Sequence, residues 1–416
     1  MTKTLKDIQD KLDSNEAAVF TADEFKTKLK NGEKLTVDDV DVVTCGTSGV
    51  MSGTTALLHI PVAEPGEFNR AKEVYINGIE AYPGPCPNEL LGTIDVFLYG
   101  TNHSTTIKDY GGGFLIKDLL ENREVEVKVV DIEGNVFTNT VTLDDMPTAR
   151  LIGTRMAFKN YNSFTNPKPK AVKSIFNASD MEGPYNSFSF SGCGDINPLE
   201  NDPEQTVITE SKKVLLNGAE GRIIDNGTRS TKEKPNLLLT ANLKDMNSYY
   251  MGGFKTAMGP EIFNSVAVPI PVLNDDILEK LKVTNEDIKL PVCDIRGRHL
   301  PIDTVDYTVW DDVDYRPLTN PDNCFSCIPC LPEIYCPVNA YRKDKTIDMD
   351  LCVGCGYCAT VCPRGVPTIN MGSIKIRAED KDRTIPVTCR QSDKKRAIEI
   401  SMELKKRILD GSFKLE

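Results

Sequence analysis

The sequence predicts a mixed α/β body together with a small cysteine-rich module in the C-terminal third of the chain. Strand-like alternation and helix-like apolar periodicity follow one another over most of the chain. A length of 416 residues exceeds the size of one small core, so two domains are expected. Eight of the thirteen cysteines fall within residues 324–362. The pattern leaves the topology of the body undetermined.

The composition is that of an ordinary globular protein, with 40% apolar and 26% charged residues. A net charge of -12 argues against a nucleic-acid partner, because phosphate binding needs a basic surface. No apolar run approaches the roughly 20 residues that span a bilayer. The polar N-terminal residues lack the apolar segment of a signal peptide. We therefore expect a cytoplasmic protein with no membrane and no nucleic-acid partner.

Two short helices and a strand are expected at the N-terminus. An apolar face over residues 5–12 predicts the first helix. Thr21-Ala-Asp-Glu24 is a capping box that begins the second. Residues 39–44 alternate as a strand does, and the small residues from Cys45 to Thr54 predict a loop after it.

The rest of the body continues as mixed α/β. Further strands are expected where β-branched and aromatic residues alternate with polar ones, at 73–76, 93–99, 124–130 and 138–142. Gly111–Gly113 precede a helical stretch that ends near Leu120, and residues 274–282 also have helical character. From 207 to 271, glycine turns alternate with short apolar runs.

The C-terminal tail predicts two strands, at 373–377 and 384–387, and then a long helix over Ser392–Leu409. Asp393 or Ser392 caps the helix, and Gly411 ends it. One face of this helix is apolar, formed by Ala397, Ile400, Leu404 and Ile408. Such a helix is not stable alone in water, so we expect it to dock on the large body.

The clustered cysteines indicate metal ligands, because a large chain without an export signal keeps its thiols reduced. The first motif is Cys324-x2-Cys327-x2-Cys330-x5-Cys336-Pro. The second motif is Cys352-x2-Cys355-x2-Cys358-x3-Cys362-Pro. Three thiolates at this spacing fit three irons of one cube, and the distant fourth cysteine belongs to the other cube. The spacing predicts a ferredoxin-like module with two [4Fe–4S] clusters.

Cross-ligation divides the cysteines into two quartets. The first quartet is Cys324, Cys327, Cys330 and Cys362. The second quartet is Cys352, Cys355, Cys358 and Cys336. Structural zinc is the alternative, but zinc sites favour two separated Cys-x2-Cys pairs. The five-residue spacer in the first motif predicts a loosened loop at Leu331–Tyr335. Two adjacent clusters form a two-step electron path, which requires a redox partner protein.

Several segments of the body resemble a known family. They are residues 74–82, 111–119, 142–146, 189–199, 243–247 and 268–274. In this order they resemble the homocysteine-biosynthesis domain of archaea and anaerobic bacteria. With the cysteine motifs included, the chain resembles the methanogenesis marker 16 family of metalloproteins. The resemblance covers most of residues 5–310.

The resemblance implies sulfur insertion, in which aspartate semialdehyde becomes homocysteine. A cysteine persulfide or bound sulfide attacks the carbonyl, and two electrons reduce the adduct. The resemblance also implies that the tail belongs to the body, so that the module is an insertion. The expected domains are 1–318 plus 372–416 for the body and 319–371 for the module. The family pattern has a cysteine near Gly49 and another within residues 130–137, where this chain has none.

Three cysteines of the body are candidate sulfur carriers. Cys45 enters the predicted loop of small residues, where backbone N–H groups lower a thiol pKa. Cys193 lies between glycines that leave its sulfur open to approach, and Cys86 is held between prolines. The alternative for each is a structural role, as a buried inert thiol or part of a rigid turn. Convergence of the three in space would favour a shared site.

Two functions follow from these observations. One is a redox-dependent sulfurtransferase acting on a small-molecule or sulfur substrate, which requires a pocket with a thiol within electron-transfer reach of a cluster. The other is a non-enzymatic iron–sulfur electron carrier, or a metallocluster assembly or delivery factor, for a methanogenesis protein. This second function requires an exposed cluster edge, an apolar patch and no ligand-sized pocket.

Overall fold

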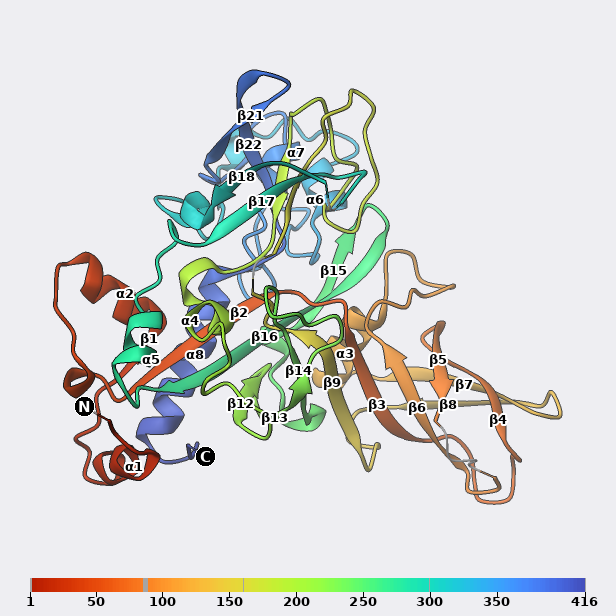
Figure 1. Cartoon of the computed structure of the whole chain (residues 1–416). Helices are drawn as coiled ribbons and strands as arrows, with labels where there is room; N and C mark the ends of the chain where they lie inside the picture. The colour runs from red at the N-terminus through yellow and green to blue at the C-terminus, as the bar shows by residue number, and fades with distance from the viewer. Residues whose placement is uncertain (1, 85–88, 160, 299, 416) are drawn as a thin grey trace.

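The computed structural model describes residues 2–84, 89–159, 161–298 and 300–415. It confirms the prediction of a mixed α/β architecture, which two sheets dominate. Figure 1 shows the large sheet across the lower half of the molecule, with the smaller sheet and the cysteine-rich segment above it.

The large sheet has 14 strands, and almost all of its neighbours are antiparallel. The order is β1 (Val19–Thr21), β2 (Val42–Val50), β16 (Gly259–Pro271), β12 (Lys213–Leu216), β13 (Ala219–Asn226), β14 (Leu237–Asn242), β9 (Ala149–Met156), β3 (Thr54–Pro61), β6 (Thr93–Tyr99), β5 (Ile79–Pro83), β4 (Ala71–Ile76), β7 (Val125–Asp131) and β8 (Val136–Val141). β15 (Gly252–Thr256) pairs with β16 beside this path. The only parallel pair of this sheet within the described residues is β1 with β2.

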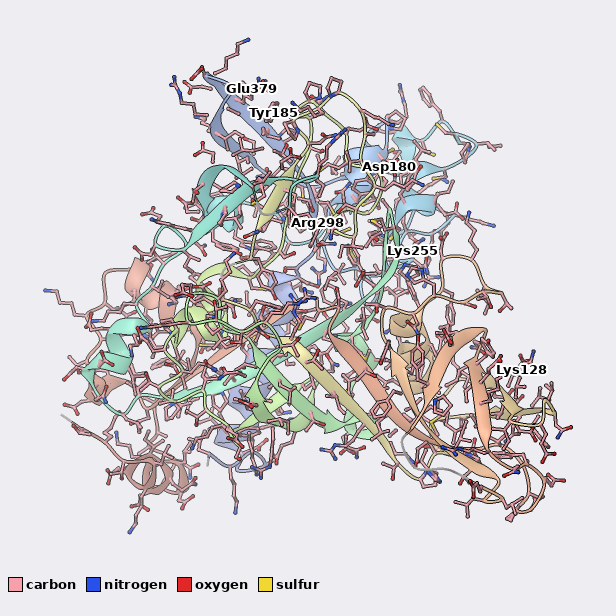
Figure 2. The ribbon with its side chains drawn as sticks, turned by 45° about the vertical axis from the view of Figure 1, so that its right-hand side comes forward. Lys128, Asp180, Tyr185, Lys255, Arg298 and Glu379 are labelled. Carbon is pink, nitrogen blue, oxygen red and sulfur yellow. The ribbon has the colours of Figure 1, made fainter. Side chains whose placement is uncertain are left out.

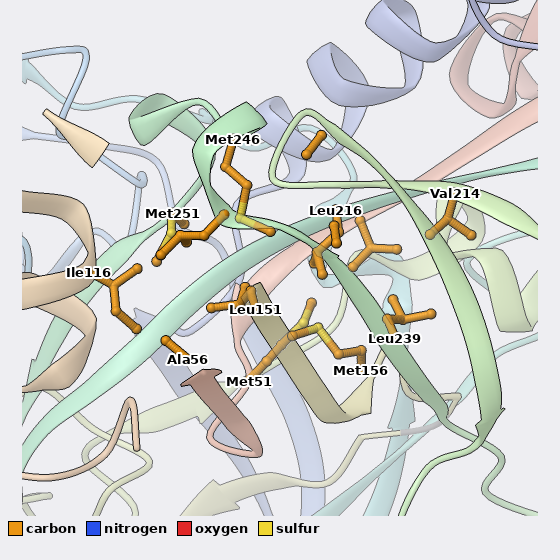
Figure 3. Close-up of a cluster of buried hydrophobic side chains, with 14 of the residues drawn as sticks. Met51, Ala56, Ile116, Leu151, Met156, Val214, Leu216, Leu239, Met246 and Met251 are labelled. Carbon is orange, nitrogen blue, oxygen red and sulfur yellow. The ribbon is translucent and has the colours of Figure 1, made fainter. Parts of the chain in front are cut away.

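One face of this sheet carries the main apolar core. Every second residue of β3 is buried, as expected of a strand with one covered face. Figure 3 shows Ala56 of β3 and Leu151 of β9 in one cluster with Ile116, which belongs to α3 (Gly112–Leu120). Burying a side chain of leucine size contributes roughly 1.5–3 kcal/mol, so this layer holds the sheet together.

The smaller sheet brings the C-terminal tail into the body. Its order is β18 (Pro301–Asp306), β17 (Lys289–Asp294), β10 (Ser163–Thr165), β11 (Phe188–Phe190), β22 (Lys381–Arg390) and β21 (Ser373–Ala378). β22 pairs in parallel with β11, and β21 with β22 in antiparallel. The two strands predicted in the tail are therefore confirmed, with β22 longer than expected.

The last helix, α8 (Lys394–Leu409), docks on the large sheet as predicted. The side chain of Asp393 caps it by accepting from the N–H of Arg396. Its apolar face is buried against β2 and β16, through Ala397, Ile400, Leu404 and Ile408.

The predicted loop over Cys45–Thr54 is wrong for residues 45–50, because β2 continues through Val50 in register with β16; residues 51–53 connect β2 to β3. The small residues serve close packing instead of a turn. A Cβ on Gly46 would meet the carbonyl oxygen of Ala397, and one on Gly49 would meet Ser392 Oγ at 2.7 Å. Glycine here lets the strand lie directly on α8.

The remaining helices are short: α1 (Leu5–Asp13), α2 (Ala22–Lys30), α4 (Pro198–Asn201), α5 (Asp275–Lys280), α6 (Leu331–Tyr335) and α7 (Tyr357–Val361). The capping box predicted at Thr21 is present. Among the described residues, no helix combines the length and apolar character needed to cross a membrane.

The cysteine-rich segment leaves and rejoins the body at one place. β19 (Leu318–Thr319) pairs there with β20 (Pro367–Thr368). The loosened loop predicted at Leu331–Tyr335 is wrong, since these residues form α6, with a proline in its first turn where no N–H is needed. The domain boundaries at 318 and 372 stay a prediction.

Candidate functional site

The first quartet surrounds a cavity of about 220 Å³. All four of its thiols line this cavity, namely Cys324, Cys327, Cys330 and Cys362. Cys327 is exposed, and the guanidinium of Arg364 stacks 3.6 Å from the ring centre of Phe325 at the rim. This quartet therefore lies at the molecular surface.

The second quartet is buried: Cys336, Cys352, Cys355 and Cys358. Burial, and then the proximity of Cys336 and Cys352, raises the pKa of Cys358 to about 12. Burial also raises the pKa of Cys355 well above its ordinary value, with Cys389, Cys336 and Cys358 adding to the effect. The last cysteine of the first motif thus lies with the second motif.

Tyr341 marks the boundary between the quartets. Its pKa is raised first by burial and then by Cys330, Cys362 and Cys324. The last cysteine of the second motif therefore lies with the first motif. The structure brings together the cysteines of each quartet, and their role as ligands stays a prediction.

Each quartet offers four thiols, and backbone N–H groups point at two sulfurs of the second quartet, a donor set that suits an iron–sulfur cluster. A tetrahedral zinc ion holds its sulfurs about 3.8 Å apart. Within the described ranges, no three His, Cys, Asp or Glu side chains are gathered as they would be around one ion. Backbone N–H groups already point at sulfur, from Ala340 to Cys336 Sγ (3.1 Å) and from Gly354 to Cys352 Sγ (3.4 Å). Such donors are typical around iron–sulfur thiolates.

The module is attached to the large sheet beside the second quartet. Figure 2 labels Lys255, which lies on β15. The backbone N–H of Lys255 donates to the carbonyl of Pro337 (2.8 Å). The Nζ atom of Lys255 donates to the carbonyl of Ile334 (3.2 Å). Phe254 and Phe263 pack with Cys355 in one buried cluster. These contacts hold the second quartet against the body.

A segment of the body, residues 389–396, joins the second quartet to a polar pocket. At one end, the N–H of Arg390 donates to the carbonyl of Cys355 (3.0 Å). At the other end, Lys394 Nζ lies 3.1 Å from Asp195 Oδ1. Ser392 Oγ between them accepts from the N–H of Gly192 (2.7 Å). Residues 389–396, called the connecting segment from here on, thus contact both the second quartet and the polar pocket.

The polar pocket has a volume of about 360 Å³ and is lined almost entirely by polar side chains. They include Asp23, Lys26, Lys30, Asp195, Asp311, Asp312, Tyr315 and Lys394. Lys394 and Asp195 form a buried ion pair in its wall. Burial disfavours the Lys394 cation, but the facing Asp195 carboxylate outweighs it and raises the pKa of Lys394. Carboxylates and ammonium groups together suit a small zwitterion.

Lys26 anchors the pocket from α2. Burial lowers its pKa to about 8, because the charged form loses its hydration. Its ammonium donates to Asn201 Oδ1 (2.9 Å) and to the carbonyls of Leu281 and Val283. Three acceptors satisfy its three donors, so Lys26 has a structural role.

Cys45 and Cys193 lie in the core behind this pocket, both with no exposed surface. Burial raises the pKa of Cys45 to about 12, with Lys26 opposing it. Burial also raises the pKa of Cys193 to about 11, opposed by hydrogen bonds from Ser48 and Thr47 and by Lys394. Both sulfurs are protonated thiols at neutral pH in this conformation.

These positions correct two expectations. Cys45 lies in a strand instead of a loop, so its pKa is raised and not lowered. The glycines flanking Cys193 do not open it to approach, because other side chains fill the space. Tyr307 Oη lies 2.3 Å from the position that a Cβ on Gly192 would take, and Asn285 Oδ1 lies 2.3 Å from that on Gly194. Cys86 lies outside the described residues.

The structure nevertheless brings Cys45 and Cys193 to the same group of charges, since Lys26 acts on one thiol, Lys394 on the other, and Asp195 on both lysines. These charged residues were not predicted from the sequence. Lys394 carried a signal, because a lysine in the first turn of a helix opposes the helix dipole.

Comparison with known proteins gives one family and several relatives. A family model described as homocysteine biosynthesis enzyme, sulfur-incorporation, matches residues 17–415. An uncharacterized protein of Methanothermobacter thermautotrophicus is 50% identical over 99% of this chain and 94% of its own length. No solved structure matches the chain.

Two further relatives have informative names. The L-aspartate semialdehyde sulfurtransferase of Methanocaldococcus jannaschii is 30% identical over 70% of this chain and 58% of its own length. A Halobacterium salinarum protein, provisionally named as an iron–sulfur subunit of dimethyl sulfoxide reductase, is 35% identical over 20% of this chain and 34% of its own length. The chain is thus similar to a sulfurtransferase and, over a shorter stretch, to an iron–sulfur protein.

Proposed function

Because the chain belongs to the family of homocysteine biosynthesis enzymes for sulfur incorporation, we propose that it couples electron transfer to sulfur insertion in a methanogen-type anaerobe. Two [4Fe–4S] clusters, one at each quartet, would supply electrons one at a time when bound. The observation that carries the proposal is the connecting segment, which touches both the second quartet and the polar pocket.

The length of the connecting segment limits the distance that electrons must cross. Arg390 touches the second quartet and Lys394 lines the pocket. Their Cα atoms are four residues apart, so they are separated by at most about 14 Å even in a fully extended chain. Electron transfer falls steeply with distance, and this short path suits a reductive step in the pocket.

The proposed conversion is balanced as follows. An aldehyde, the persulfide of the sulfur carrier, four electrons and four protons give a thiol, the free carrier thiol and one water. The carbon–oxygen double bond and the sulfur–sulfur bond break, a carbon–sulfur bond forms, and the aldehyde carbon and the transferred sulfur each gain two electrons. The substrate class is a small amino acid with an aldehyde, by analogy with the named relative. In the pocket, Asp23 suits its ammonium group and Lys394 its carboxylate.

Cys193 is the proposed sulfur carrier, with Cys45 and Cys86 as the other candidates. A sulfur carrier acts as its thiolate. Burial keeps Cys193 protonated, and Lys394 is the charged neighbour that lowers its pKa. Entry of a substrate that separates Lys394 from Asp195 would bring water to this corner and favour the thiolate.

A redox partner protein is proposed to deliver electrons at the first quartet. The rim there exposes large apolar side chains, with Ile328 98% and Phe325 68% exposed. Cys327 is also exposed, which leaves little protein between this cluster site and a partner. Exposed apolar groups close to one another mark interaction surfaces.

The same rim supports a second candidate, a non-enzymatic electron carrier or a metallocluster assembly or delivery factor. The complete burial of Cys45 and Cys193 also favours this function. The two candidates differ in whether the protein itself forms a thiol from an aldehyde.

The test uses the full chain purified under argon, supplied with aspartate semialdehyde, inorganic polysulfide as the donor of sulfane sulfur, and a low-potential reductant. We expect homocysteine by mass spectrometry, and its loss in Cys193→Ser. Cys293→Ser is the matched control, because Cys293 is a buried cysteine in another cluster of side chains. No product from the wild-type protein, with intact clusters, would favour the carrier.

Cluster content is tested on the same preparation. We expect about eight irons and eight acid-labile sulfides per chain, because each cube holds four of each. A colourless, zinc-containing protein would overturn the cluster assignment and, with it, the proposed function.

A further inference from the structure

Arg390, at the end of β22, is a fully buried arginine without a carboxylate partner among the described residues. We propose that Arg390 is the counter-cation of the cluster at the second quartet, so that this cluster is reduced more easily than the one at the first quartet. The inference rests on the proposed function, because it requires a cluster at each quartet.

The contacts of Arg390 are incomplete. Nη1 donates to the carbonyl of Asp314 (2.7 Å), and the guanidinium lies 4.7 Å from the ring centre of Trp310. Nε and Nη2 are buried and have no hydrogen-bond partner in the described part of the chain. Burying a charged group without partners costs several kcal/mol, so an anion belongs beside it.

The second quartet is the anionic candidate that contacts Arg390 directly, whereas Asp314 and Asp393 favour its cation without forming an ion pair with it among the described residues. The backbone N–H of Arg390 donates to the carbonyl of Cys355, which places the residue directly beside a cluster ligand. Cys355 is also the strongest of the groups that favour the charged form of the guanidinium. Four thiolates outweigh the positive charge of an iron–sulfide core, so the cluster is an anion that gains further negative charge on reduction.

Two other cations lie beside the second quartet. Lys255 lies near Cys336, but it is partly exposed and its Nζ donates to the carbonyl of Ile334. Arg316 lies near Cys352, but its two Nη atoms donate to the two carboxylate oxygens of Asp393 (2.9 and 2.7 Å). That pair is neutral as a unit. Arg390 is therefore the fully buried cation on this side of the module that forms no ion pair among the described residues.

The first quartet has a different environment. Lys345 Nζ lies 3.9 Å from Cys330 Sγ, and Arg364 lines the same cavity. Arg364 is exposed and Lys345 is partly exposed. Water and salt screen charges at the surface far more than buried ones, so these cations change a potential less than Arg390 does.

The consequence is a direction of electron flow. One electron enters at the exposed first cluster and moves to the second, which oxidises the first and reduces the second. The buried guanidinium stabilises the additional negative charge at the second site. The second cluster lies beside the connecting segment, so the direction is toward the polar pocket.

The test is a potentiometric titration of the holoprotein under argon, followed by electron paramagnetic resonance. Cys327→Ser, which alters an exposed ligand of the first quartet, assigns the two signals. We expect Arg390→Gln to reduce the reduced-to-oxidised ratio of the second cluster at least tenfold at a fixed potential, equivalent to 59 mV for one electron. Arg390→Lys should restore most of this change, and Arg364→Gln should leave the second cluster unchanged.

A second variant keeps the inference testable if Arg390→Gln does not fold. Asp314→Asn removes a negative charge near Arg390, while its side-chain oxygen still accepts from the N–H of Asn370. We expect the second cluster to become easier to reduce. Unchanged potentials in Arg390→Gln and Asp314→Asn, or equal shifts of both clusters, would overturn the inference. With eight irons per chain present, that result would leave the proposed function intact.

Discussion

Lys394 and Asp195 form an ion pair whose side chains are only 6% and 3% exposed. Removing one partner of such a pair leaves the other as an uncompensated buried charge. The ion pair therefore stabilises this side of the polar pocket only when both Lys394 and Asp195 are present. It is hard to predict from sequence, since its partners lie 199 residues apart.

We expect Lys394→Met to lower the free energy of unfolding by about 3–5 kcal/mol, because Asp195 loses its buried partner. Urea unfolding under argon, followed by circular dichroism, measures the change. The double variant Lys394→Met with Asp195→Asn should recover a large part of the loss. Equal losses in the single and double variants would show that the charge of Asp195 is not the cause.

Cys45 makes stability depend on pH at the alkaline side. The unfolded thiol ionises near its ordinary pKa of 9.0, whereas the folded thiol stays protonated to about 12. Its contribution to stability is complete below pH 9 and is lost as the pH rises from 9 toward 12. The stability advantage of wild type over Cys45→Ala should fall by about 1.4 kcal/mol between pH 8 and pH 10. A constant difference in unfolding free energy would contradict this assignment.

The part of the site that could be predicted from sequence is the part that is local. The spacing of the cysteines predicts which thiols of each motif lie together, because the short spacers place three successive thiols around one cluster site. The polar pocket is different, since Lys26 donates to the carbonyl of Leu281, 255 residues away. No local pattern records such a contact. The pKa of Cys45 was likewise beyond prediction, because it depends on burial in the assembled core.

At the scale of elements, local signals worked where a helix or strand has one buried face. The capping box at Thr21 and the apolar stripe of α8 predicted their helices correctly. They failed at β2, where both faces are covered and small residues allow α8 to approach. A run rich in glycine has the same composition in a loop and in a tightly packed strand, so only the tertiary contacts distinguish them.

The docking of α8 can be tested on the helix itself. Leu404 is fully buried between the helix and the large sheet. Leu404→Ala should cost about 2–5 kcal/mol through lost burial and the cavity that remains. The control is Met402→Ala on the exposed face, which should change unfolding free energy by less than about 0.5 kcal/mol. Similar effects of the two substitutions would mean that the face of α8 is assigned wrongly.

At the scale of the whole molecule, the two quartets differ in their relation to solvent. The first lies at a surface with exposed apolar side chains, and the second lies on the side of the module that packs against the large sheet. Under the proposed function, electrons would enter at the first quartet and be used on the side of the second, at opposite sides of the module.

Entry at the first quartet predicts a specific defect. Ile328→Glu places a charge in the exposed apolar rim and should slow reduction by a protein donor at least tenfold, without changing cluster content or spectra. Stopped-flow bleaching of the clusters measures the rate. Reduction by dithionite should stay normal, because a small reductant does not need the rim. Ile224→Glu, at an exposed position on β13, is the control for added surface charge.

The pairing of β19 with β20 also bears on how such a chain is assembled from parts. Neighbouring strands lie about 4.8 Å apart, so the two ends of residues 320–366 are close enough for a tight turn to replace them. Deletion of residues 320–366 would thus require little change of the backbone. It would, however, expose Phe254, Phe263 and Arg390 on the surface of the remaining body. A cofactor unit grafted at this point therefore requires a recipient whose surface has been altered to receive it.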